Sequence, residues 1–200
     1  MSWEDSNACT ALKRDFLRSW FALERRYFLT GGSALGLFYL DHRRSFDLDL
    51  STSAEVEPRE VQNLIHRVSG EIDASYEAIQ TAPGFHRFRL TRDEESELVD
   101  VVIDRAPQLD EEKADIGGIR VDTLREIIAN KLATLISRAE SKDLVDLYFL
   151  EQAGHDLLAS IPDAKVKDGG WEPAMVSMLL DSLRPAELPA PFHPSTVSVR

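Results

Sequence analysis

Hydrophobic residues recur at helical spacing towards both ends of the chain and alternate with polar residues in its middle. Helical periodicity predicts helices with one buried face over 8–26, 33–40, 59–72, 123–139, 142–152 and 173–183. Short apolar or alternating segments predict strands over 27–30, 47–51, 85–90, 98–103 and 119–121. This order of elements predicts an α+β fold, in which a small mixed sheet is flanked by helices and followed by a helical C-terminal region.

The same pattern suggests how the chain is divided into parts. We expect a core over residues 1–122 and a helical region over 123–184 that packs on this core. Residues 185–200 form a proline-rich tail, and the four prolines within 185–194 favour an extended conformation over a packed one.

Composition narrows the class of protein. A hydrophobic fraction of 43% and a charged fraction of 29% are typical of soluble globular proteins. No apolar run approaches the roughly 20 residues that span a bilayer, and no signal peptide is evident. Cys9 is the single cysteine, which excludes an intrachain disulfide and fits a cytoplasmic protein. The net charge of −12 argues against broad contact with nucleic acid, so any such contact must be local.

The first candidate for chemistry is the sequence Gly31-Gly32-Ser33, which lies between a predicted strand and a predicted helix. Two glycines allow a sharp turn and a close approach of the backbone to a ligand. The N-terminus of the following helix presents free N–H groups that suit an anion such as phosphate. A simple turn with Ser33 as a helix cap is the alternative interpretation.

Three aspartates on predicted strands form the second candidate. Asp47 and Asp49 alternate with apolar residues, so both carboxylates point to one face of a strand. Asp100 interrupts a later apolar strand and is a candidate third carboxylate, with Asp104 at the strand end as a less suitable substitute. Such carboxylates suit a pair of Mg²⁺ ions that support displacement at phosphorus. The alternative is an exposed strand with acidic residues facing water.

Two cations interrupt the apolar face of the helix predicted over 123–139. Lys131 and Arg138 fall within its hydrophobic stripe, where a cation needs an anionic partner or ligand. A triphosphate would serve, but so would a structural ion pair with Asp146 on the next predicted helix, which carries Asp143 on the same side and is apolar almost all round. We expect both aspartates to be about half buried.

Two separate blocks of the sequence resemble a known family. The sequence Gly-Gly-Ser, the spacer 34–46, Asp-Leu-Asp-Leu and a later strand aspartate resemble the polymerase-β-like nucleotidyltransferase superfamily. The closer resemblance is to the AbiEii-type nucleotidyltransferase toxins, which have a similar opening. They also carry a second block like Asn130-Lys131-Leu132-Ala133 followed by Asp146-Leu147-Tyr148. The resemblance covers roughly residues 27–152.

The resemblance implies roles for individual residues. The residues expected to bind the nucleotide are Gly31, Gly32, Ser33, Lys131 and Arg138. Those expected to bind metal are Asp47, Asp49 and Asp100. Catalysis is expected to involve Asp47, Asp49, Asp100, Lys131 and Asp146.

The implied activity is Mg²⁺-dependent transfer of a nucleoside monophosphate from an NTP to an acceptor hydroxyl. By the same resemblance, the acceptor is RNA, with tRNA first, and the protein is the toxin of a toxin–antitoxin or phage-defence system restrained by an antitoxin. Two alternatives stay open. One is a nucleotidyltransferase that acts on a small molecule or a protein, and the other is a catalytically idle module that binds an NTP or a partner.

Overall fold

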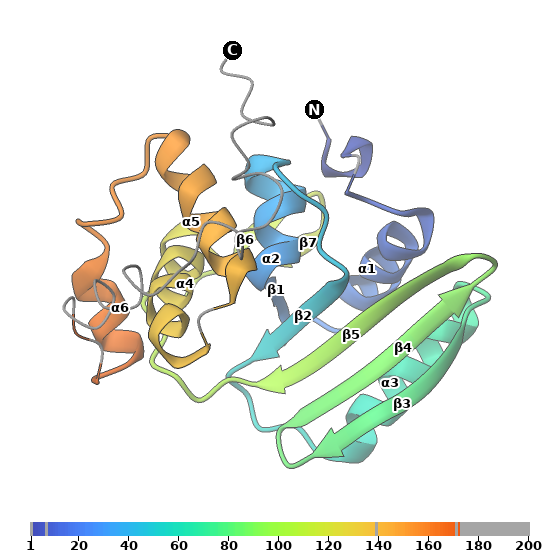
Figure 1. The fold of residues 1–200 in the computed structure, drawn as a ribbon. Coiled ribbons are helices and arrows are strands. Elements are labelled where there is room, and N and C mark those ends of the chain that lie inside the picture. The colour runs from blue at the N-terminus through green and yellow to red at the C-terminus, as the bar shows by residue number, and fades with distance from the viewer. Residues whose placement is uncertain (1, 7, 139, 171, 173–200) are drawn as a thin grey trace. The chain divides into compact units, whose positions relative to one another are not determined.

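The computed structural model describes residues 2–6, 8–138, 140–170 and 172, and Figure 1 shows the path of the chain. The described chain forms two compact units. The first contains the residues up to Arg105 together with Glu111–Leu124, and the second contains Ala106–Asp110 and the residues from Arg125 onward. The helix predicted over 173–183 and the proline-rich tail lie outside the described residues.

A mixed sheet forms the centre of the first unit. Its seven strands have the order β3-β4-β5-β2-β1-β7-β6. The pairs β1–β7 and β2–β5 are parallel and the others are antiparallel. The strands are β1 (Phe28–Thr30), β2 (Asp47–Thr52), β3 (Ser75–Ala82), β4 (Phe85–Arg92), β5 (Glu95–Ile103), β6 (Ala114–Ile116) and β7 (Ile119–Val121).

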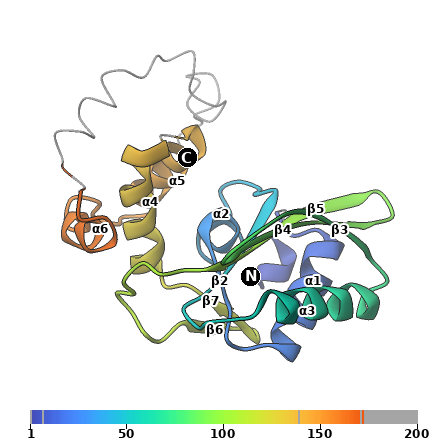
Figure 2. The same ribbon diagram turned by 90° about the horizontal axis from the view of Figure 1, so that it is seen from below.

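Two amphipathic helices cover one face of this sheet. Figures 1 and 2 show α1 (Ala11–Leu23) and α3 (Pro58–Glu71) on the same side of the strands. The Thr10 side chain caps α1 by accepting a hydrogen bond from the backbone N–H of Lys13. Proline at the first position of α3 is compatible with a helix start, because the N–H it lacks would have no partner within the helix.

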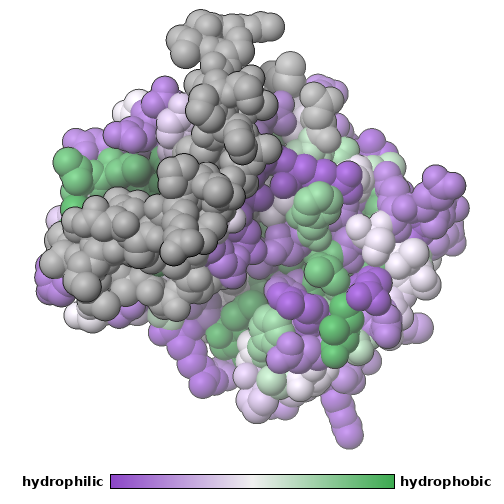
Figure 3. Space-filling view, in the orientation of Figure 1, coloured by the Kyte–Doolittle hydropathy of each residue, from purple (hydrophilic) through white to green (hydrophobic). Residues whose placement is uncertain are grey.

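The two faces of β2 and β5 differ in the way that their alternating sequences predict. The residues that face the helices are almost fully buried: Leu48, Leu50, Val99 and Val101. Asp47, Asp49 and Asp100 lie on the opposite face, since neighbouring residues of a strand point to opposite sides. No helix of the described first unit covers that face of β4 and β5 (Figure 1). In the space-filling view, polar and apolar residues are intermingled over it (Figure 3).

The segment between β1 and β2 differs from the single helix predicted over 33–40. It begins as a short α-helix, α2 (Gly31–Ala34), and continues as a π-helix, η2 (Leu35–Leu40). Asp41 then takes a left-handed conformation with φ 48°, which ends the helical segment. Because α2 packs against β2, the glycines of the turn lie next to the acidic strand.

Three helices make up most of the second unit, namely α4 (Leu124–Arg138), α5 (Ser141–Gln152) and α6 (Ile161–Lys167). The buried Glu126 carboxylate in α4 accepts hydrogen bonds from the backbone N–H groups of Leu109 and Asp110, at 2.6 and 2.9 Å. It also lies 2.5 Å from the ammonium of Lys167. These contacts explain why residues 106–110 belong to this unit.

The structure confirms the α+β class and adds four elements that the sequence pattern missed, namely β3, β6, α6 and the short 3-10 helix η1 (Trp3–Asp5). The edge strand β3 is exposed along almost its whole length, so it has no alternation of buried and exposed residues to reveal it. Strand β6 and helix α6 are too short to show a clear period. Among the described residues, no helix has the length and apolar character needed to cross a membrane.

Candidate active site

Four side-chain positions form one rung across the middle of the sheet. Thr30 in β1 is paired with Asp49 in β2, and Asp49 is paired with Asp100 in the parallel strand β5. Asp100 is paired in turn with Arg87 in β4. Residues directly opposite each other on neighbouring strands project to the same face. The sheet register therefore brings Asp100 beside Asp49, although 50 positions separate them in the sequence.

Asp47 lies two residues before Asp49, on the same face, and is held by the loop that precedes β2. The Ser45 hydroxyl donates a hydrogen bond of 2.6 Å to Asp47 Oδ1. The main-chain carbonyl of Ser45 accepts a hydrogen bond of 2.7 Å from the ammonium of Lys13, which is buried beside Glu97 at 3.3 Å. Burial lowers the pKa of Lys13, and the Glu97 carboxylate opposes that effect. A buried ion pair thus fixes the start of the acidic strand.

The glycine turn lies directly against this strand. Gly31 has φ 67°, a left-handed conformation, and a Cβ at this position would overlap Asp49 Oδ2. A Cβ on Gly32 would lie 2.6 Å from a guanidinium nitrogen of Arg43. The Ser33 hydroxyl donates a hydrogen bond to the main-chain carbonyl of Asp47, and Ser33 is buried. The Ser33 side chain therefore ties the turn to β2, and its predicted contact with phosphate stays a prediction.

Substitution of Gly31 tests the close approach of this turn to Asp49. We expect Gly31→Ala to destabilise the protein by about 1–2 kcal/mol, because alanine is strained in the left-handed region. We also expect it to displace the Asp49 carboxylate and reduce nucleotidyl transfer by more than the stability loss explains. Thermal unfolding and a transfer assay measure the two effects. Gly70→Ala in α3 is the control, since a Cβ there meets nothing within 4 Å and alanine favours a helix. Full activity of Gly31→Ala would contradict the expectation.

Arg87 is a member of the rung that the sequence analysis did not single out. Its guanidinium donates two hydrogen bonds to the Asp100 carboxylate, Nε to Oδ1 at 2.7 Å and Nη2 to Oδ2 at 2.6 Å. The Asp100 hydrogen bond raises the pKa of Arg87, with smaller contributions from the charges of Asp47 and Asp49. A signal was present in the sequence, because a two-residue turn at 93–94 pairs Arg92 with Glu95 and therefore Arg87 with Asp100.

The carboxylates on this face fit a divalent cation in type and in strand placement. Mg²⁺ prefers oxygen ligands, and Asp47, Asp49 and Asp100 offer only carboxylate oxygens. Yet within the ranges the structure describes, no three His, Cys, Asp or Glu side chains are arranged to hold an ion. Both Asp100 oxygens accept hydrogen bonds from Arg87. Coordination by Asp100 would therefore require Arg87 to release at least one oxygen.

The second unit contains a separate buried cluster around Lys131. Its ammonium lies 2.8 Å from Asp143 Oδ1 and 2.6 Å from Asp146 Oδ2. Lys131 is 5% exposed and both aspartates are 0% exposed, whereas the sequence suggested that the aspartates would be half buried. The structural ion pair between Lys131 and Asp146, one of the two alternatives that the sequence predicted, is therefore present. The side chain of Arg138 lies outside the described residues.

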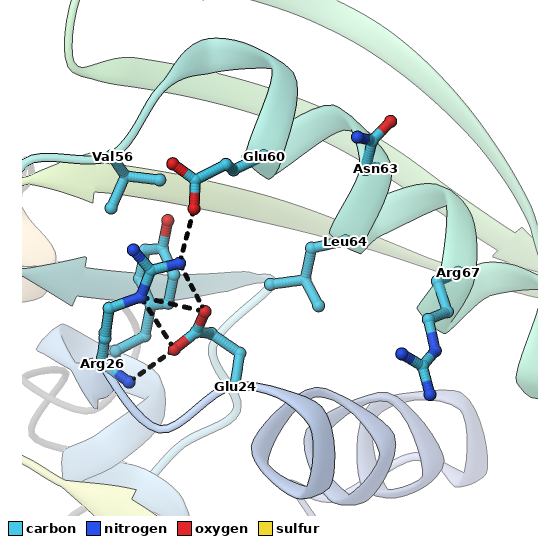
Figure 4. Close-up of a pocket in the computed structure, with 8 residues that line it drawn as sticks. Glu24, Arg26, Val56, Glu60, Asn63, Leu64 and Arg67 are labelled. Atoms are coloured by element: carbon cyan, nitrogen blue, oxygen red, sulfur yellow. Dashed lines mark hydrogen bonds and ion pairs between the residues drawn. The ribbon is translucent and has the colours of Figure 1, made fainter.

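Two other features of the first unit differ from the acidic face. A pocket of about 280 Å³ is lined by residues of the connection between α1 and β1, by Val56 and by α3. There Arg26 forms ion pairs with Glu24 and Glu60 (Figure 4).

Burial raises the pKa of the Cys9 thiol to about 11, so Cys9 is not expected to supply a thiolate nucleophile at neutral pH.

Comparison with solved structures identifies the class of fold. A candidate nucleotidyltransferase from H. pylori matches with a TM-score of 0.58 and 20% identity, over 85% of this chain and 92% of that chain. JHP933 from Helicobacter pylori matches with a TM-score of 0.59 and 20% identity, over 85% of this chain and 89% of that chain. At this level of identity the likeness concerns the fold, which is that of nucleotidyltransferases.

The family follows from the sequence itself. Residues 15–190 match the family described as "Nucleotidyl transferase AbiEii toxin, Type IV TA system". The chain belongs to this family of nucleotidyltransferase toxins, as the two sequence blocks predicted. Family membership implies nucleotidyl transfer in a type IV toxin–antitoxin system. No curated protein matches the chain significantly.

Proposed function

We propose that this protein transfers a nucleoside monophosphate from an NTP to a hydroxyl of RNA, with tRNA as the first candidate, in a Mg²⁺-dependent reaction. It acts in the cytoplasm as a toxin that a cognate antitoxin restrains. The observation that carries the proposal is the rung in which Asp49 lies directly opposite Asp100, with Gly31 against Asp49. A set of carboxylates beside a glycine turn suits a nucleotide that binds together with a divalent ion.

The proposed reaction is an in-line displacement at the α-phosphorus. The acceptor oxygen forms a bond to that phosphorus, the bond to the bridging oxygen of the β-phosphate breaks, and pyrophosphate leaves. Mg²⁺, when bound, neutralises charge on the phosphates and lowers the barrier to attack. Asp47 and Asp49 would hold the ion, and Asp100 would complete its ligands and accept the proton of the attacking hydroxyl.

The phosphate chain needs donors as well as the ion. We propose that the backbone N–H groups at Gly31 and Gly32 face the triphosphate, as the start of a glycine turn allows. Arg43 adds a cation beside Gly32. For the second unit, we propose that Lys131 contacts a phosphate, that Asp146 orients its ammonium, and that Arg138 assists in binding the nucleotide.

An acidic protein needs a local explanation for RNA binding. The net charge of −12 disfavours long-range attraction of RNA, so we expect few phosphate contacts and a weak dependence of RNA affinity on salt. The sequence His42-Arg43-Arg44 before the acidic strand supplies two neighbouring cations, Arg43 and Arg44. Phe46, which is exposed, follows it, and the Arg44 guanidinium lies 5.2 Å from the Phe46 ring centroid.

The proposal is tested by incubating the protein with each labelled NTP, Mg²⁺ and total RNA, beside the Asp49→Asn variant. We expect label on RNA of tRNA size with one or two of the four NTPs, no label without Mg²⁺, and none with the variant. Parallel reactions contain a mixture of cellular proteins or a small-molecule fraction in place of RNA. Label only in those reactions would show that the acceptor is a protein or a small molecule rather than RNA, with nucleotidyl transfer retained. No label in any reaction would favour a catalytically idle binding module.

A further inference from the structure

The Arg87–Asp100 ion pair lies where the proposed metal site needs a free carboxylate. We propose that Arg87 is a positioning residue that occupies the Asp100 carboxylate in the metal-free protein and yields it to a divalent cation. The strength of this ion pair then sets how tightly the cation binds. The inference rests on the proposed function, because it assumes that Asp100 joins Asp47 and Asp49 around an ion.

The geometry is that of a strong and specific pair. The two hydrogen bonds, at 2.7 and 2.6 Å, join a planar guanidinium to both oxygens of one carboxylate, which is the best-matched arrangement for these groups. The strand register places Arg87 directly opposite Asp100, so the pair forms without any distortion of the sheet. The Arg87 guanidinium also lies 5.6 Å from the ring centroid of Phe85, on the same face of β4.

Electrostatics gives a reason for a cation at this place. Asp47, Asp49 and Asp100 bring three carboxylates to one face of two neighbouring strands, and like charges at short distance repel each other. Without an ion, a fixed cation next to Asp100 reduces this repulsion.

Burial indicates which partner can move. The side chain of Asp100 is 7% exposed and that of Arg87 is 37% exposed. The arginine can therefore leave for water while the carboxylate stays in place. A divalent cation carries twice the charge of the guanidinium, and Asp100 would share it with Asp49 on the neighbouring strand, whereas Arg87 lies on the other side of Asp100.

The test measures binding of Mn²⁺, a spectroscopic substitute for Mg²⁺, by electron paramagnetic resonance, together with thermal unfolding. We expect Arg87→Gln to bind Mn²⁺ about tenfold more tightly than the wild type, which corresponds to about 1.4 kcal/mol. We also expect a lower metal-free melting temperature and a larger upward shift on addition of Mn²⁺. Neither readout requires catalytic activity. Arg87→Lys keeps the charge but not the two-pronged contact, so its affinity should lie between the two.

Arg89→Gln is the matched control. Arg89 lies two residues further along the same face of β4 and pairs with Glu77 at 3.0 Å. It removes the same charge, so unchanged Mn²⁺ affinity in this variant shows that the direct pair matters rather than the general field. An equal gain in both variants would contradict the inference.

The remaining outcomes separate the inference from the proposed function. One outcome would keep the metal site but contradict the competition by Arg87. In it, the wild type binds Mn²⁺, the Asp49→Asn variant does not, and the Arg87→Gln variant binds with the same or a weaker affinity than the wild type. If neither the wild type nor Arg87→Gln binds Mn²⁺, both the metal site and the inference are wrong. Binding by Arg87→Gln alone would support the inference.

Discussion

Nucleotidyl transfer by Asp49→Asn is expected to fall by about 10²- to 10³-fold, the range seen when one preorganised donor is removed from a catalytic site. Asp49 lies at the centre of the rung, opposite Asp100 and against Gly31, so its carboxylate is next to both the neighbouring strand and the glycine turn. Asparagine has nearly the same shape but lacks the negative charge that a divalent ion requires. Steady-state incorporation of labelled nucleotide measures the loss.

The protein should stay folded in this variant, and that separates the interpretation from simple unfolding. Removing one of several adjacent carboxylates relieves repulsion, so we expect an unchanged or slightly raised melting temperature without metal. Asp104→Asn is the control, because Asp104 follows β5 four residues beyond Asp100 and is not part of the rung. Equal losses in the two variants would contradict the assignment of Asp49, and so would retention of most activity in Asp49→Asn.

Lys131→Met is expected to lower the free energy of unfolding by about 3–5 kcal/mol, the range for removing one partner from a buried ion pair. The ammonium of Lys131 lies between Asp143 and Asp146, and both carboxylates are fully buried. Methionine has a similar length and fills the space but leaves two buried negative charges without their shared cation. Urea unfolding followed by circular dichroism measures the change.

A lysine on the surface of the same unit provides the control for this prediction. Lys165 in α6 pairs with Glu172 at 3.6 Å, and its side chain is 44% exposed. Lys165→Met should change stability by less than about 1 kcal/mol, as exposed ion pairs contribute little. Adding Asp143→Asn to Lys131→Met should restore part of the loss, because one buried charge is removed. A loss below about 1 kcal/mol for Lys131→Met would contradict the buried-charge explanation.

Local sequence patterns were sufficient for the central strands of the sheet. The alternation around Asp47 and Asp49 predicted both their strand and their shared face, because burial of Leu48 and Leu50 forces the aspartates to the other side. A two-residue turn at 93–94 joins β4 to β5, and a turn of this length places Arg87 opposite Asp100. The alternating pattern of β4 alone does not distinguish Arg87 from the other polar residues of this strand, so the ion pair follows only once the turn is placed at these two residues.

Other features depended on contacts between distant segments. The Ser33 hydroxyl donates to the carbonyl of Asp47, which no local pattern around the glycine turn indicates. The edge strand β3 pairs with β4 along its length while its residues stay exposed, so its sequence lacks the periodicity that reveals a strand. The segment 106–110 belongs to the second unit because Glu126 binds its backbone, a contact across 16 or 17 positions.

The sequence by itself determined the α+β class, the two family blocks, and the faces on which Asp47, Asp49 and Lys131 lie. It could do so because burial of one face of a helix or strand requires hydrophobic residues at a regular spacing, which is visible in the local sequence. Only the tertiary structure decided that Asp100 lies opposite Asp49 and that Lys131 lies between Asp143 and Asp146. Strand order and these ion-pair partners are set by packing between segments far apart in sequence, and the local spacing of hydrophobic residues does not indicate which segments will be neighbours.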